Sequence, residues 1–341
     1  MSVIIGIDPH KRLHAAYAID VGERELAAVE VRAGARQVPE LLRWARSFED
    51  RRWAIESANG LGYLLAQQLV AAGEHVVDVP STLSARVRTL SSGKSTKNDS
   101  NDARAVAVAA LHAPSLALVR GEDHVSVLRL LAKSQLDLAR ARNRACCRFH
   151  ALAADLAAGG MRKEVVVSQA EQLLATITPE TGAQRQRAEL ADEVLDEIRA
   201  LDARLKLSKK RIAAAVTVSG TSLTEIFGVG PIIAAMIIGY TGDPARFPTA
   251  GHYAAYNGTA PVEFSSGGRT VHRLSRRGNR TLNHAMHMIA VTQIRHLHSE
   301  GRRYYDAKLA AGKTKREAMR ALKRQISDRV YRHLRADGAA R

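Results

Sequence analysis

Two long stretches with helical periodicity, residues 126–155 and 184–218, divide this sequence into three parts. Leucines recur along both stretches at three- and four-residue spacing between many charged side chains, which is typical of amphipathic helices. Neighbouring helices of this length favour a coiled-coil arm that makes dimer contacts or bridges domains, with a plain helical subdomain as the alternative. We therefore expect three domains: residues 1–118, a helical coiled-coil linker and dimerisation region at 119–218, and a mainly helical domain at 219–341.

The first part alternates between strand-like and helical segments. Short apolar runs predict strands at residues 3–8, 14–19, 25–31, 53–56 and 75–79. Helical spacing predicts helices at residues 38–48, 61–72, 81–88 and 99–112. Three meandering strands followed by alternating helices and strands indicate an α/β fold, in which helices cover a mixed sheet.

The C-terminal part carries most of the net charge. Lys and Arg number 51 against 34 acids, a net charge of +17, and residues 251–341 contribute +13 of it. An excess gathered in one segment is typical of a face that binds a polyanion. Aromatic residues are only 4% of the chain, which argues against base-stacking platforms of the RRM or OB type. The chain is therefore expected to contact nucleic-acid backbones through its C-terminal part.

Other features of the sequence point to the cytoplasm. The longest nearly uncharged apolar run, residues 229–240, is too short to span a bilayer, and the N-terminus shows no signal peptide. The adjacent Cys146 and Cys147 cannot staple a fold or form a four-ligand zinc site. We expect a cytoplasmic protein with no membrane partner.

Four carboxylates stand at positions where they can converge. Asp8 and Glu56 end predicted strands, while Asp99 and Asp102 lie three residues apart on one face of a predicted helix. Gathered carboxylates repel one another, and a divalent cation relieves that repulsion. Oxygen ligands suit Mg²⁺, with Mn²⁺ as a substitute, and such ions can polarise a phosphodiester. Each acid alone is ordinary, and the helical pair could simply favour a helix N-terminus.

A loop with paired serines offers a nucleophile. Ser265 and Ser266 precede two glycines, and a basic run without acids follows at Arg269, His272, Arg273, Arg276, Arg277 and Arg280. Cations can polarise a phosphate that a serine attacks, and glycines let DNA approach closely. The alternative is a surface loop before a basic helix, and no general base stands beside the serines.

A glycine-rich turn opens the last part of the chain. Residues 223–235 read LTEIFGVGPIIAA, an apolar-Gly-apolar-Gly turn between two helices. This is the form of a helix-hairpin-helix, whose turn lets backbone N–H groups approach a phosphate. A tight turn between packed helices is the alternative.

These motifs resemble, in the same order, those of the insertion-sequence 110 transposases, the bridge-RNA-guided serine recombinases. The similarity covers nearly the whole chain. It is carried by GIDPHK at 6–11, IES at 55–57, KNDSNDAR at 97–104, GVGP at 228–231, GTAP at 258–261, SGG at 266–268, GNRTL at 278–282 and AGKTK at 311–315. The family's usual Gly-Leu-Thr-Pro reads Gly-Thr-Ala-Pro here, a departure on a structural turn.

The resemblance implies a RuvC-like (RNase H-type) N-terminal domain, a coiled-coil linker and a C-terminal transposase domain. The metal-binding acids carry over to Asp8, Glu56, Asp99 and Asp102, and the catalytic serine to Ser266, with Ser265 as the near alternative. The family pattern places both in a composite site between subunits. The nucleic-acid contacts are expected at Arg269, Arg273, Arg276, Arg277, Arg280, Lys313, Lys315 and Arg316.

The activity implied is the cutting and rejoining of double-stranded donor and target DNA through a covalent phosphoserine, with Mg²⁺ as cofactor. A structured bridge RNA would select the sequence by base pairing, as in other RNA-guided systems. The resemblance also implies a homodimer that becomes a tetramer in the synaptic complex.

Three other functions stay open on the sequence. The first is a metal-dependent RuvC-like junction resolvase or nuclease that uses water rather than serine. The second is a non-catalytic DNA- or RNA-binding protein. A sugar-kinase-type ATPase is a distant third, because no second phosphate loop accompanies the Gly-Ile-Asp turn.

Overall fold

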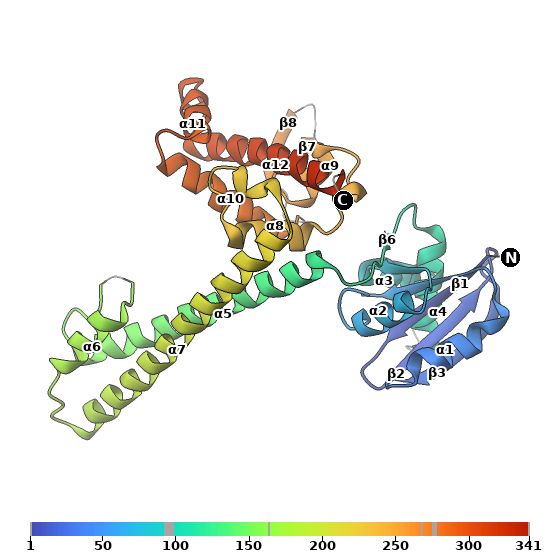
Figure 1. Ribbon diagram of the computed structural model, residues 1–341, viewed down its shortest axis with the longest axis horizontal. Coiled ribbons are helices and arrows are strands. Elements are labelled where there is room, and N and C mark those ends of the chain that lie inside the picture. Colours follow the sequence, from blue (N-terminus) through green and yellow to red (C-terminus); the bar gives the residue numbers. More distant parts are fainter. Residues whose placement is uncertain (1, 92–98, 163, 267–268, 275–277, 340–341) are drawn as a thin grey trace. The chain divides into compact units, whose positions relative to one another are not determined.

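The computed structural model of the chain (Figure 1) divides into two compact units, Met1–Glu122 and Asp123–Arg341. It describes residues 2–91, 99–162, 164–266, 269–274 and 278–339. For residues 91, 99, 100, 262–266 and 269–274, the description covers the backbone alone. Each unit is considered by itself.

The first unit is built on a 6-stranded sheet with the order β3-β2-β1-β4-β5-β6. β1 runs antiparallel to β2 and parallel to β4, and β5 is parallel to β4. The strands are β1 (Val3–Pro9), β2 (Leu13–Ile19), β3 (Glu25–Arg32), β4 (Arg51–Glu56), β5 (Val76–Val79) and β6 (Ala117–Leu118). The mixed sheet that the sequence predicts is confirmed.

Helices cover both faces of this sheet. They are α1 (Gln37–Trp44), α2 (Tyr63–Ala71), α3 (Ser81–Ser91) and α4 (Asp99–His112). All seven residues of β1 are buried, which is expected of a central strand covered on both sides. Side chains alternate along a strand, so Ile5 and Ile7 pack with Leu65 of α2, and Ile4 faces Val106 of α4.

The second unit begins with two long helices that pack against each other, α5 (His124–Leu156) and α7 (Gly182–Val218), with the short α6 (Val167–Ala175) between them in the chain. Their apolar stripes form a core of their own, centred on Phe149, Leu195 and Ile198. The Asp123 side chain caps α5, and a capping box at Thr181 starts α7. The two long helical stretches predicted from the leucine spacing are confirmed.

The rest of the second unit is mainly helical, as expected. Its elements are α8 (Pro231–Thr241), α9 (Ala250–Tyr256), β7 (Pro261–Ser266), β8 (Arg269–Leu274), α10 (Arg280–Arg295), α11 (Glu300–Ala310) and α12 (Lys315–Ala339). Its core is formed by apolar side chains such as Ile237, Tyr253, Ile289 and Val330. The turn before α8 packs against α10. A Cβ added to Gly228 in this turn would lie 3.3 Å from the Ile289 carbonyl oxygen of α10.

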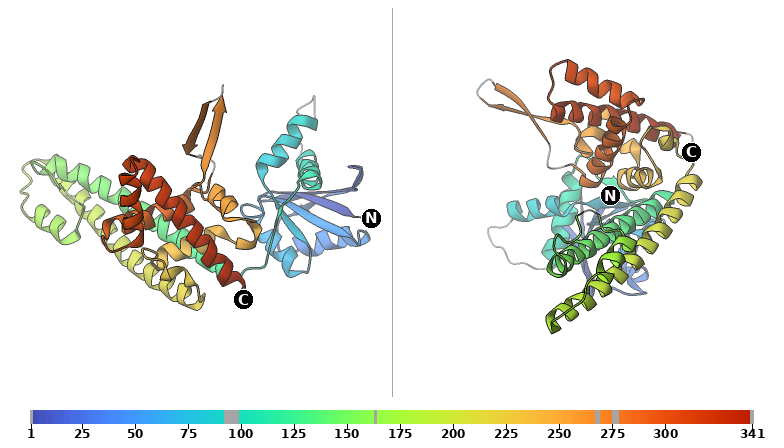
Figure 2. Two further views of the ribbon diagram at one scale, coloured as in Figure 1. Left: turned by 90° about the horizontal axis from the view of Figure 1, so that it is seen from above. Right: turned by 90° about the vertical axis from the view of Figure 1, so that its left-hand side faces the viewer.

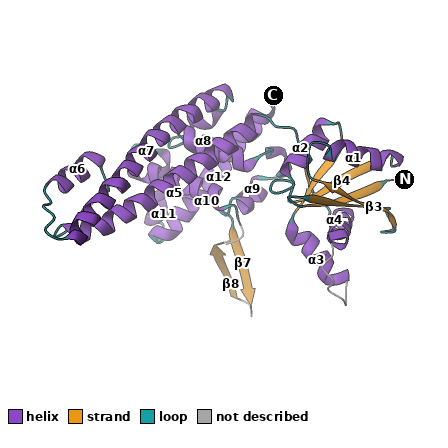
Figure 3. Ribbon diagram, turned by 90° about the horizontal axis from the view of Figure 1, so that it is seen from below, coloured by secondary structure: helices purple, strands orange, loops and turns teal. Residues whose placement is uncertain are grey.

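Two local expectations are wrong. Ser265 and Ser266, expected in a loop, lie in strand β7, and the basic helix of the alternative interpretation is absent from residues 269–274. Residues 269–274 form strand β8, paired with β7, and not the start of a basic helix (Figure 3). β-branched and aromatic residues favour strands, and here Val262, Phe264, Thr270 and Val271 outweigh the basic composition.

No helix in the described part of the chain has the length and apolar character needed to cross a membrane.

Candidate active site

Two of the predicted acids lie at the same level of neighbouring strands. β1 and β4 are parallel with Ile7 opposite Ile55, so Asp8 and Glu56 are the next residues along each strand. Side chains two or four positions apart on a strand point to the same face, so Asp8 lies on the face of Ile4 and Glu56 on the face of Ala54. Ile4 and Ala54 pack in the cluster that includes α4, so both acids lie on the sheet face that α4 covers. Because β1 and β4 are neighbours in the sheet, two acids that are 48 positions apart in the sequence lie next to each other.

Helix α4 brings the third acid, Asp102, to this face. The helix crosses β1 at Gly6, where an added Cβ would lie 2.2 Å from the Ala103 carbonyl oxygen and 2.4 Å from the Ala107 nitrogen. Only glycine permits so close an approach of helix to strand. Gly6 and Asp8 share one face of β1, so this crossing also sets Asp102 near Asp8.

The charges of these acids act on one another. Burial, which leaves Asp8 7% exposed, is the main cause that raises its pKa to about 6. His10, whose Nδ1 lies 3.6 Å from Asp8 Oδ2, acts against this rise. The charges of Glu56 and Asp102 and a hydrogen bond between the Asp8 and Glu56 carboxyl groups raise the Asp8 pKa further. Asp8 is thus buried beside other acids without enough positive charge to offset the cost of its ionisation.

Helix α3 supplies partners that the sequence analysis missed. The Ser84 hydroxyl donates to Glu56 Oε1 at 2.5 Å, and Arg88 Nη1 lies 3.1 Å from Asp102 Oδ1. Ser84 and Arg88 are four residues apart in a segment predicted to be helical, so the sequence could have predicted that they share one face of the helix. Their partners, however, depend on how α3 packs.

The loop after Glu56 is held by a further acid, Asp78 of β5. Its carboxylate accepts hydrogen bonds from the Ala58 backbone N–H at 2.7 Å and the Asn59 amide at 2.8 Å. Ser57 adopts a left-handed φ of 52°, which is strained for a residue with a side chain. Asp78 thus stabilises the turn that follows Glu56.

The donor set suits a hard divalent cation. Carboxylate oxygens are the ligands that Mg²⁺ and Mn²⁺ prefer, and the raised pKa of Asp8 marks a place where added positive charge is favourable. Among the side chains described, no group of three or more His, Cys, Asp or Glu residues is already arranged to hold a metal ion. Asp99, the first residue of α4, is described by its backbone alone.

The predicted nucleophiles lie in the second unit, at the end of β7. Ser265 pairs with Thr270 and Ser266 with Arg269, at the last register positions of the β7–β8 hairpin. Figure 2 shows that this hairpin extends away from the helices of its unit. Backbone geometry thus places the serines near its outer end.

The predicted nucleic-acid contacts are distributed over several elements. Arg269 and Arg273 lie in β8, and Arg276 and Arg277 lie outside the described residues. Arg280 begins α10 with an exposed side chain. The remaining three, Lys313, Lys315 and Arg316, are exposed where α11 connects to α12.

Comparison with known proteins gives matches over both units. Residues 220–306 match the family described as "Transposase IS116/IS110/IS902 family", and residues 5–156 match a transposase model named for the DEDD transposases of IS110. A protein of insertion element IS116 from Streptomyces clavuligerus is 28% identical over 97% of this chain and 94% of its own length. A probable family 20 transposase of Pseudomonas aeruginosa is 27% identical over 81% of this chain and 79% of its own.

A protein of insertion element IS110 from Streptomyces coelicolor is 39% identical over 33% of this chain and 28% of its own length. Among solved structures, RuvC of Thermus thermophilus in complex with a Holliday junction covers 35% of this chain and 100% of RuvC, at 18% identity and a TM-score of 0.27.

Proposed function

The chain belongs to the IS116/IS110/IS902 family of transposases, and on that premise we propose that it cuts and rejoins donor and target DNA through a covalent phosphoserine intermediate. The observation that carries the proposal is the convergence of Asp8, Glu56 and Asp102 on one sheet face, with the pKa of Asp8 raised to about 6. Although Arg88 pairs with Asp102, the charges of Glu56 and Asp102 still raise the pKa of Asp8, as expected of acids gathered for function.

Asp8, Glu56, Asp99 and Asp102 are the residues proposed to hold Mg²⁺, or Mn²⁺ in its place. Bound there, the cation would polarise the scissile phosphate. Ser84 and Arg88 orient two of the carboxylates, and Asp78 fixes the turn after Glu56. These contacts limit the movement of the acids while DNA binds.

Ser266 is the proposed nucleophile, with Ser265 as the alternative. Its oxygen forms a bond to phosphorus and gives up its proton to solvent. The bond from phosphorus to one sugar oxygen breaks, and that oxygen takes up a proton from solvent to become a free hydroxyl. The energy of the phosphodiester is kept in the phosphoserine bond, so a hydroxyl of another strand can reverse the step without ATP.

The proposal extends to partners and domain roles. Residues 1–118 provide the acids, residues 119–218 the coiled-coil dimerisation arm, and residues 219–341 the serine. The acids and the serine meet in a composite site between subunits of a homodimer, which pairs into a tetramer when both DNAs are bound. A structured bridge RNA selects the sites by base pairing, and the C-terminal arginines contact nucleic-acid backbones without reading sequence.

A trapping experiment tests the nucleophile. The protein is incubated with its element DNA and Mg²⁺, denatured, and separated on a gel that resolves protein–DNA adducts. We expect an adduct with the native chain and with Ser265→Ala, and none with Ser266→Ala. An adduct lost only in Ser265→Ala would move the role to that residue.

The convergence of the acids within one unit also favours a second candidate, a nuclease that uses water. That function predicts cleavage that persists in Ser266→Ala, requires Asp8, and leaves no adduct. The same gel separates the two functions, since free cleaved DNA and adduct migrate differently.

A further inference from the structure

At the base of the β7–β8 hairpin, the chain segment before β7 and the segment after β8 cross in close contact. A Cβ added to Gly278 would lie 2.6 Å from both the nitrogen and the Cα of Gly258, which itself has a φ of +73°. The Asn279 backbone N–H donates to the Tyr256 carbonyl oxygen at 2.7 Å. We call this crossing, residues 256–259 and 278–279, the hairpin foot.

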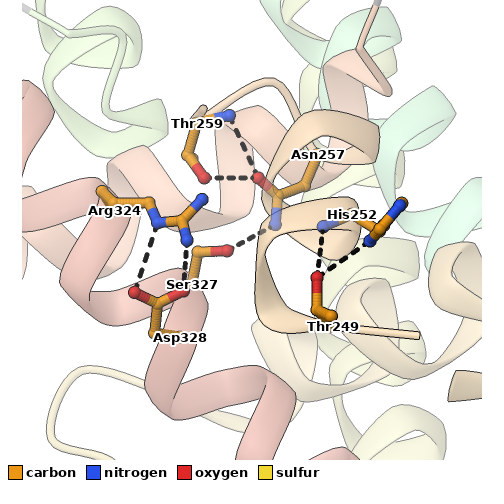
Figure 4. Close-up of polar contacts among 7 residues, drawn as sticks. All are labelled: Thr249, His252, Asn257, Thr259, Arg324, Ser327 and Asp328. Atoms are coloured by element: carbon orange, nitrogen blue, oxygen red, sulfur yellow. Dashed lines mark hydrogen bonds and ion pairs between the residues drawn. The ribbon is translucent and has the colours of Figure 1, made fainter. Parts of the chain in front are cut away.

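The side-chain amides of Asn257, which is buried, and Asn283, which is half-buried, bind the hairpin foot to the helices. The fully buried Asn257 donates to the Ser327 hydroxyl of α12 at 2.7 Å and accepts from the Thr259 N–H and hydroxyl (Figure 4). From α10, the Asn283 amide donates to the carbonyl oxygens of Asn257 at 3.1 Å and Gly258 at 2.9 Å. The base of the hairpin is thereby tied to α10 and α12.

Lys323 of α12 adds a positively charged group to this hydrogen-bond network. Its ammonium donates to Asn283 Oδ1 at 2.8 Å, and the side chain is 9% exposed. An ammonium has three N–H donors, yet among the described side chains Asn283 is its one hydrogen-bond acceptor, and no carboxylate pairs with it. Burial, and then the charge of Arg280, lower its pKa.

The hydrogen bond to the Asn283 amide oxygen does not by itself explain why residue 323 is a lysine. A neutral donor such as Gln could bond to Asn283 without the cost of a buried, unpaired charge. Instead a neighbour of Lys323 adds positive charge: the charge of Arg280, at the start of α10, acts on the Lys323 ammonium. Buried charges are normally paired, so this group of cations is incomplete without an anion.

We propose that Lys323 and Arg280 bind one backbone phosphate of duplex DNA at the hairpin foot, and that Asn283 transmits this contact to the hairpin. The inference rests on the proposed function for the identity of the anion as DNA. The Arg280 side chain is exposed, so a phosphate can reach it from solvent. The phosphate supplies the acceptors and the counter-charge that the ammonium lacks, and it sets the hairpin base relative to the DNA strand.

The salt dependence of DNA binding tests the phosphate contact. The full chain is titrated with a short fluorescent duplex of arbitrary sequence over a range of salt concentrations. Loss of one phosphate contact lowers the slope of log affinity against log salt by about 0.9 for B-form DNA. We expect this reduction in Lys323→Met and in Arg280→Gln, and a native slope in Lys323→Arg.

Matched controls separate charge from structure. Arg43→Gln removes a charge that is also exposed, from α1, and should keep the native slope. Ser327→Ala breaks the hairpin-foot bond to Asn257 without a change of charge and should also keep it. Because Arg280 is exposed, Arg280→Gln remains informative even if Lys323→Met fails to fold, which its circular-dichroism melt reveals.

A native slope in Arg280→Gln, or in a folded Lys323→Met, overturns the proposal. If Lys323→Met and Arg280→Gln lower the slope for single-stranded RNA but not for duplex DNA, the assignment of the ligand as duplex DNA is overturned. These readouts are independent of covalent chemistry, since Ser266→Ala should bind the duplex with the native slope whether or not Ser266 is the nucleophile.

Discussion

Replacing Asp8 by Asn should make the N-terminal unit more stable while it removes activity. The pKa of Asp8 rises from 3.8 to about 6 on folding, chiefly through burial and then through the nearby acids. At 1.36 kcal/mol for each pKa unit, this corresponds to ~3 kcal/mol of destabilisation when the group is ionised. Asn stays uncharged but still loses hydration, so we expect a net gain of about 1–2 kcal/mol at pH 7.

The sign of the pH dependence follows from the raised pKa. A protonated Asp8 costs little, so the native chain suffers no penalty below pH 4, and the penalty grows as pH rises through about 6. The advantage of Asp8→Asn should therefore be full at pH 7 and above, and absent near pH 4. Mg²⁺ should reduce this advantage, because an ion that binds the folded carboxylates stabilises only the native chain.

Urea unfolding followed by tryptophan fluorescence measures this effect. The chain has 2 tryptophans, Trp44 and Trp53, and both lie in the N-terminal unit, so the signal reports that unit alone. The matched control is Asp20→Asn. Asp20 is also buried, but its carboxylate accepts the N–H groups of Gly22 and Arg24 at 2.8 and 2.9 Å, and its replacement should destabilise the unit.

The reasoning is refuted if Asp8→Asn without divalent ions is no more stable than the native chain at pH 7. It is equally refuted if an advantage seen there persists unchanged at pH 4.

Three further predictions concern the crossing of α4, the hairpin foot and the guide. Gly6→Ala should destabilise the N-terminal unit by about 2–3 kcal/mol in the same urea assay, because its Cβ meets backbone atoms of α4. Gly34→Ala, with nothing within 4 Å, should change stability by less than about 0.5 kcal/mol, and equal effects at both glycines would contradict the close crossing. Asn257→Ala should slow adduct formation in the trapping gel and leave the tryptophan-monitored unfolding unchanged; a native adduct rate would show that the foot does not position the serines. Purified protein should carry one structured RNA species, found by sequencing the co-purified nucleic acid, and a random mixture of cellular RNA would argue against a guide.

The elements of the N-terminal unit were largely predictable. Residues 3–8 and 53–56 were expected as strands ending in acids, and β1 and β4 carry Asp8 and Glu56 near their ends. An apolar run bounded by polar residues is a local pattern, so it can be read without knowledge of the rest of the chain. Asp102 was likewise expected on a helix, and it lies on α4.

The supporting groups of the site were less predictable. Ser84 and Arg88 are ordinary residues of a short helix, and their roles depend on the packing of α3 beside Glu56 and Asp102. Strands β7 and β8 were not predicted, because serines and arginines interrupt their strand-forming residues and make the segment resemble a polar loop. Lys323 gave no signal in the sequence, since a lysine in a charged amphipathic helix is normally exposed.

The sequence alone determined most helices and strands of the N-terminal unit, the two long helices, the segregation of positive charge to the C-terminal part, and the motifs that mark the family. These depend on spacing and composition along the chain, which are local quantities. Only the tertiary structure decided that β1 and β4 are neighbours, that α4 crosses at Gly6, and that Lys323 is buried against Asn283. Burial and charge–charge energies depend on distances between residues remote in sequence, and folding sets those distances.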